Sequence, residues 1–128
     1  MAEPYHLRLE MLGVPSMNTA DNRHWRVRQK EKLRWYVRVR MAAMAARKGW
    51  PRLSRARVRI TRCTAANRQP DFENLAQGGK FILDGLVKCG VLLDDNPDVI
   101  GQPEYRWEKA KRGEAHVIVE VFEEETDG

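Results

Sequence analysis

Alternation of apolar and polar residues marks four short segments of the chain. Residues 5–12 (YHLRLEML) alternate loosely, and residues 56–63 (ARVRITRC) alternate with arginines on one face. Residues 99–107 and 115–122 alternate again and are joined by the connection KAKRGE, which predicts a hairpin. A period of two is typical of strands that bury one face, so these segments predict a single sheet.

Residues 23–49 follow a helical period instead, and Gly49 with Pro51 ends the predicted helix. The residues expected to form its buried stripe are Leu33, Val37, Met41 and Met44.

A second helix is predicted from Asp71, which suits an N-cap, to about Cys89, with Gly90 as the C-terminal stop. The pair Gly78-Gly79 weakens a helix by about 1 kcal/mol per glycine relative to alanine, so a start near Lys80 is also considered.

The predicted order is β-α-β-α-β-β, an α+β fold in which two long helices pack on a mixed sheet. The 128 residues suggest one domain over 1–128, with a frayed acidic tail from about residue 123. A chain of this size buries roughly two thirds of its unfolded surface, enough for one core.

Charge is distributed unevenly along the chain, whose net charge is +5. Residues 1–66 hold 16 Lys and Arg against 4 Asp and Glu (net +12), and residues 67–128 hold 7 against 14 (net −7). The basic half would attract nucleic acid, and the acidic half either pairs with it or holds metal ions. Cys63 and Cys89 lack metal-ligand spacing and are expected to be reduced thiols. We also expect no membrane span and a cytoplasmic location.

Carboxylates lie at both ends of the second predicted helix: Asp71 and Glu73 before it, Asp94 and Asp95 after it. A helix over 74–89 is about 24 Å long, and six extended residues cover about 20 Å, so the chain can run back toward Asp71. Converging carboxylates repel one another unless a cation is present, and oxygen ligands alone suit Mg²⁺ or Mn²⁺. Such a metal site beside a basic surface suggests phosphodiester hydrolysis, with Lys80 as a fixed positive charge.

Each of these residues also has a simpler interpretation. Asp71 alone is a helix cap, Glu73 alone suits a first helical turn, and DDNPD alone is a turn. Lys80 and Asp84, one turn apart, could form a surface ion pair. Only the joint pattern favours a metal site.

The joint pattern is similar to that of a known family. The stretches DFENL, Lys80, DGL and GVLLDD in order, with VPSMN and HWRVR before them, resemble the RusA family of Holliday-junction resolvases. The resemblance implies a RusA-like, often prophage-encoded, homodimeric Mg²⁺-dependent endonuclease that nicks a four-way DNA junction symmetrically, with Mn²⁺ expected to substitute. It assigns metal binding to Asp71, Glu73 and Asp95, the essential lysine to Lys80, and accessory positions to Asn74 and Asp94.

Two departures from the family pattern stand out. Glu73 replaces the usual aspartate and is longer by one methylene group. Because Mg²⁺ requires a nearly ideal octahedral geometry, this change is expected to make the site less efficient. The spacing from Asp71 to Lys80 is also longer, with Gly78-Gly79 inside it, and an ungapped alignment would put Gln77 at the lysine position.

Basic and aromatic residues of the first half are candidates for DNA contact. They are Arg23, His24, Trp25, Arg26, Arg28, Lys30, Arg34 and Arg38. Trp35 and Tyr36 continue the pattern, although Tyr36 is better explained as core. QGGKF is not a phosphate-binding P-loop, so no nucleotide cofactor is expected, and zinc is not expected either.

Two other functions remain open: a junction- or duplex-binding relative with a decayed metal site, and a nuclease for RNA or flaps.

Overall fold

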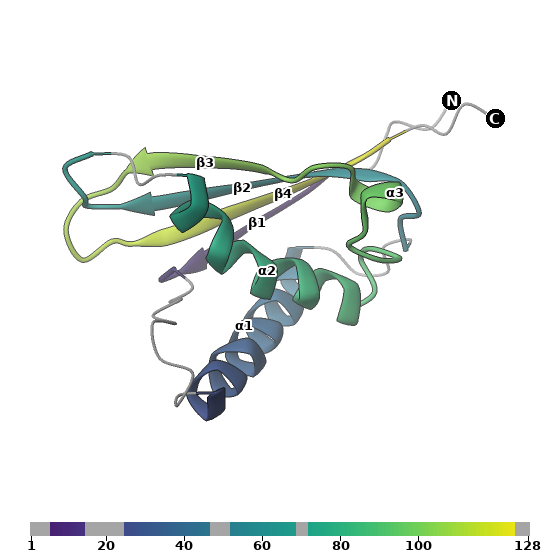
Figure 1. Cartoon of the computed structure of the whole chain (residues 1–128), viewed down its shortest axis with the longest axis horizontal. Helices are drawn as coiled ribbons and strands as arrows, with labels where there is room; N and C mark the ends of the chain where they lie inside the picture. The colour runs from purple at the N-terminus through teal and green to yellow at the C-terminus, as the bar shows by residue number, and fades with distance from the viewer. Residues whose placement is uncertain (1–5, 15–24, 47–51, 69–71, 125–128) are drawn as a thin grey trace.

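The computed structural model describes residues 6–14, 25–46, 52–68 and 72–124, which form one small α+β domain (Figure 1). Its elements are β1 (His6–Leu12), α1 (Trp25–Ala46), β2 (Ala56–Thr64), α2 (Phe72–Lys88), α3 (Pro97–Ile100), β3 (Glu104–Lys109) and β4 (His116–Glu123). None of the helices in these ranges is both long and apolar enough to cross a membrane.

The sheet is mixed, as predicted, and has the strand order β1-β4-β2-β3. β4 is antiparallel to both β1 and β2, whereas β2 and β3 are parallel. The predicted hairpin of 99–107 with 115–122 is therefore wrong, because β2 lies between β3 and β4. β4 and β2 are the two inner strands, and β4 buries its alternate valines Val117, Val119 and Val121.

Both long helices lie on one side of the sheet (Figure 1). The core between the layers is filled by alternate strand residues such as Leu9 and Val58, and by Ile82 and Leu86 of α2. Cys63 and Cys89 are free thiols, which confirms the prediction that they do not pair.

The predicted buried stripe of α1 is on the wrong face. Among the α1 residues whose side chains are described, Trp35, Val39 and Ala43 are buried. The predicted residues are exposed by the following fractions: Leu33 62%, Val37 47%, Met41 66% and Met44 57%. Apolar residues occur on two opposite sides of this helix, and the wide Trp35 ring with small Ala43 gives the side that packs on the sheet and α2.

α2 is continuous from Phe72 through Gly78-Gly79, so a start at Lys80 is also wrong. A Cβ atom on Gly79 would lie 2.4 Å from Cε1 of Tyr105 on β3, and one on Gly85 would lie 3.1 Å from Cβ of Val39 on α1. Both glycines therefore allow close packing that outweighs their low helix propensity.

The opposite face of the sheet is a network of charges. Arg59 on β2 is 3.0 Å from Glu104 and 3.5 Å from Glu120, and Arg57 is 3.5 Å from Glu124. Here the basic first half of the chain pairs with the acidic second half, one of the two arrangements that the charge distribution allowed.

Candidate functional site

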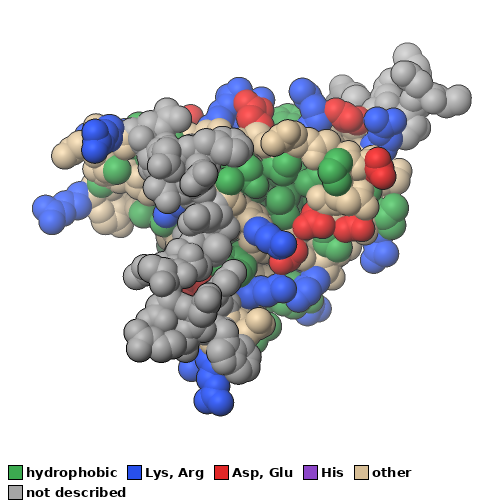
Figure 2. Space-filling model, viewed as in Figure 1, with side chains coloured by type: hydrophobic (Ala, Val, Ile, Leu, Met, Phe, Trp, Pro, Cys, Tyr) green, Lys and Arg blue, Asp and Glu red, His purple; other side chains and the backbone are tan. Residues whose placement is uncertain are grey.

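The loop after α2 brings Asp94 and Asp95 within electrostatic range of Asp84 on α2. The chain reverses at Gly90, which has a φ of 88°, and the backbone amides of Val91 and Leu92 donate to the Leu86 carbonyl. The returning loop carries Asp94 and Asp95 to the level of Asp84 on α2, where acidic side chains gather with basic ones beside them (Figure 2). The predicted approach of this loop to Asp71 and Glu73 stays a prediction, because Asp71 and the side chain of Glu73 lie outside the described residues.

Asp94 and Asp95 play different parts in this loop. One carboxylate oxygen of Asp94 accepts the backbone N–H of Asp95 (2.7 Å), and the other accepts the side-chain amide of Asn96 (3.0 Å). Asn96 in turn accepts backbone N–H bonds from Asp98 and Val99 and caps α3. Asp94 is thus a turn residue that holds the loop in shape, which leaves Asp95 as the better ligand of the two.

The electrostatic surroundings of Asp95 disfavour its charged form. Partial burial, a hydrogen bond to the Asp94 side chain and the negative charge of Asp84 together raise the pKa of Asp95 above its ordinary value of 3.8. A cation placed next to Asp95 would reverse this effect, because an opposite charge favours the carboxylate.

A lysine from the other helix offsets part of this negative charge. Lys32 of α1 lies 3.6 Å from a carboxylate oxygen of Asp84. The predicted pair of Asp84 with Lys80 is therefore replaced by a pair between the helices. Lys80 is exposed, and positions 73, 80 and 84 fall on one face of α2 because they are spaced by seven and eleven residues.

The rest of the predicted metal set lies outside the described residues. This applies to Asp71 as a whole and to the side chains of Glu73 and Asn74, although α2 includes positions 73 and 74. Position 73 is about 16 Å from position 84 along the helix axis. Within the described ranges, no group of three His, Cys, Asp or Glu side chains is arranged to hold a metal ion.

The predicted DNA-contacting residues are only partly described. Arg23 and His24 lie outside the described ranges, as do the side chains of Trp25 and Arg28. Arg26, Lys30 and Arg34 are exposed on α1.

Arg38 is engaged within the chain. It donates to the Leu12 carbonyl (2.8 Å), and its guanidinium lies 5.0 Å from the ring centre of Trp35. Trp35 is 1% exposed and donates to Glu31 (2.9 Å), so it is a core residue and not a stacking surface.

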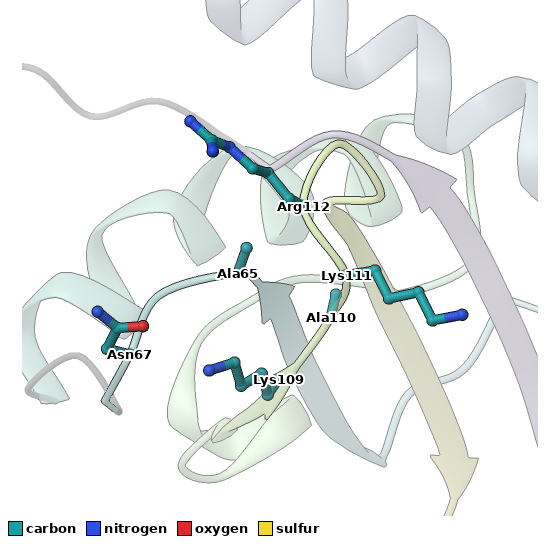
Figure 3. Close-up of a pocket in the computed structure, with 6 residues that line it drawn as sticks. All are labelled: Ala65, Asn67, Lys109, Ala110, Lys111 and Arg112. Atoms are coloured by element: carbon teal, nitrogen blue, oxygen red, sulfur yellow. The ribbon is translucent and has the colours of Figure 1, made fainter.

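The loop between β3 and β4, which the sequence predicts only as a connection, carries three basic residues. Lys109, Lys111 and Arg112 line an open depression with Ala65, Asn67 and Ala110 (Figure 3). The signal was present in the sequence, because three of the seven basic residues of 67–128 fall within four positions.

Comparison with known proteins does not assign a family. No protein-family model matches the chain, and no curated protein matches it significantly. The resemblance to junction resolvases thus depends on the motif residues themselves.

Proposed function

We propose that this protein is a metal-dependent DNA endonuclease that cuts four-way junctions by paired nicks. The observation that supports the proposal is the acidic surrounding of Asp95: partial burial, a hydrogen bond to Asp94 and the negative charge of Asp84 together raise its pKa. These residues share α2 and its returning loop with position 73 and Lys80. We also propose a cytoplasmic location in a bacterial or phage context.

The donor chemistry fits Mg²⁺ or Mn²⁺, since every candidate ligand is a carboxylate oxygen. In the proposal Asp71, Glu73 and Asp95 hold the metal, which when bound activates water and neutralises phosphoryl charge. Asp94 keeps the loop of Asp95 in place through its two hydrogen bonds. The exposed ammonium of Lys80 stabilises negative charge that develops on the phosphate oxygens.

Paired nicks require two active sites, so the proposal includes a homodimer. The stripe of Leu33, Val37, Met41 and Met44 supports a second copy at α1. These four apolar side chains are exposed on the side of α1 that faces away from the sheet layer, among the exposed basic residues Arg26, Lys30 and Arg40.

The test is cleavage of an end-labelled four-way DNA junction with Mg²⁺, with Mn²⁺ and with chelator. Asp95→Asn should lower the cleavage rate at least about 100-fold, because even residues that only orient metal ligands cost 10- to 100-fold. Asp98→Asn is the matched control, since it makes the same chemical change at an exposed position three residues away. The control should cut as the wild type does.

Two results would redirect the proposal. Salt-sensitive junction binding without nicks in either metal would indicate the decayed, non-catalytic relative, and Glu73→Asp would then be the restoring variant to try. Preferential cutting of flap or RNA competitors would keep the chemistry and change the substrate.

A further inference from the structure

The depression beside the β3–β4 loop is built by two separate segments of the chain. It has a volume of about 690 Å³ and is lined by Ala65, Asn67, Lys109, Ala110, Lys111 and Arg112. The short side chains of Ala65 and Ala110 leave room between the segments. Figure 3 shows Lys109 and Arg112 extending toward the side on which Asn67 lies, while Lys111 points the other way.

Backbone hydrogen bonds fix the loop that carries these basic side chains. The amide of Ala110 donates to the Thr64 carbonyl (2.8 Å), which ties the loop to the end of β2. The turn closes through the Glu114 amide and the Lys111 carbonyl (3.0 Å), and Gly113 supplies the positive φ of 83° that it needs. The depression therefore lies beyond the carboxyl ends of the parallel strands β2 and β3.

Within the described residues, the basic side chains of this loop differ from Arg59 and Lys32 in their ion pairing. Lys109, Lys111 and Arg112 form no ion pair with any residue in the described ranges. By contrast, Arg59 is shared between two glutamates and Lys32 is paired with Asp84. The three cations thus remain available to an external anion.

The exposure of the lining favours a polymer over a small anion. All three cations are exposed, and no aromatic or buried polar group lines the depression, so a free phosphate would be held weakly. A nucleic acid backbone gains affinity from each such contact because it releases condensed counterions.

A short chain segment links the depression to the start of α2. Asn67 precedes Phe72, the first residue of α2, by five residues, which span at most about 18 Å. At about 3.4 Å per nucleotide of a strand, that is about five nucleotides. We propose that Lys109 and Arg112, with Asn67 between them, grip the sugar-phosphate backbone of a DNA arm next to the start of α2. This inference rests on the proposed function and supplies it with a substrate-positioning surface outside the basic first half of the chain.

Fluorescence anisotropy of a labelled four-way junction in chelator, titrated with salt, tests the grip without cleavage. The double variant Lys109→Ala/Arg112→Ala should bind about 10- to 60-fold more weakly at 0.1 M salt and lower the log–log salt slope by about 2. The control Arg55→Ala/Lys88→Ala removes two exposed positive charges at the far ends of β2 and α2, about 30 Å and 24 Å from the ends that adjoin the depression. It should bind within about twofold of the wild type, and circular dichroism confirms that each variant is folded.

Each outcome separates this grip from the proposed function. An equal loss of junction affinity in both double variants would indicate diffuse charge attraction and would overturn the proposed DNA contact. The contact would also be overturned if the Lys109→Ala/Arg112→Ala variant bound the junction as tightly as the wild type. A loss confined to that variant in a protein that never nicks DNA would keep the grip and refute the endonuclease. If the loss appears only with duplex RNA or anionic vesicles, DNA is the wrong partner. A wild type that binds no junction refutes both.

Discussion

The packing of α2 on β3 can be tested by a single methyl group at Gly79. In an exposed helix, Gly→Ala raises the free energy of unfolding by about 1 kcal/mol. At Gly79 the new Cβ would lie 2.4 Å from Cε1, 2.9 Å from Oη and 3.0 Å from Cζ of Tyr105. Tyr105 is packed against the core, so its ring is displaced at a cost in the upper part of the usual 1–3 kcal/mol for overpacking. We expect Gly79→Ala to lower the free energy of unfolding by about 1–2 kcal/mol.

The second variant needed is Tyr105→Ala, which removes the ring. In that background Gly79→Ala should stabilise by about 1 kcal/mol, because only helix propensity remains. The coupling energy of the double-mutant cycle is then about 2–3 kcal/mol, measurable by urea unfolding of the four proteins.

The melting temperature gives a second readout, since 1 kcal/mol corresponds to about 4 °C for a domain of this size. Stabilisation of the wild-type background by Gly79→Ala would refute the close approach of α2 to Tyr105. In that case, a lack of space beside Tyr105 would no longer explain why position 79 of α2 is a glycine.

Two further predictions concern the acidic loop and the outer face of α1. The pKa of folded Asp95 is raised, so the folded state binds an extra proton and stability falls as pH rises from 3.8 through the folded pKa. Asp95→Asn should therefore raise the melting temperature at neutral pH in chelator, and this stabilisation should disappear below pH 3.8. Mg²⁺ should raise the melting temperature of the variant less than that of the wild type. A variant whose melting temperature depends on pH as the wild type's does would contradict this reasoning. Met41→Glu, which leaves helix propensity almost unchanged, should reduce a dimer to the 14.9 kDa monomer in sedimentation at micromolar protein. Gln102→Glu, which adds the same charge at an exposed position that is not on α1, should not. A dimer that survives Met41→Glu must use another surface.

The elements with one apolar face were predictable from the sequence. β1, β2 and β4 alternate strictly enough that their bounds differ from the prediction by at most one residue at each end. The long helices were also found, because their periodic patterns run for several turns. In α1, however, two apolar sides have the same period, and only the neighbouring layers decide that Trp35 and not Met41 is buried.

Strand pairing and the basic loop were harder to foresee. The position of β4 between β1 and β2 depends on contacts far apart in sequence, which a local pattern does not encode. The low helix propensity of Gly79 favours a later start of α2, and the sequence does not reveal that Tyr105 packs against this glycine. The loop with Lys109 and Arg112 was predictable only as a connection. It lies near Asn67 only because β2 and β3 pair in parallel, which the sequence pattern does not show.

The strand order has a consequence for how the protein is made. Among the described strands β4 comes last in the sequence, yet it separates β1 from β2 and pairs with both. Until residue 123 has left the ribosome, the first two strands have no partner between them, and the valine-lined centre of the sheet cannot close. Such distant pairings slow folding, so the nascent chain should stay open through most of translation. The proposed endonuclease would then acquire its activity only after β4 is in place.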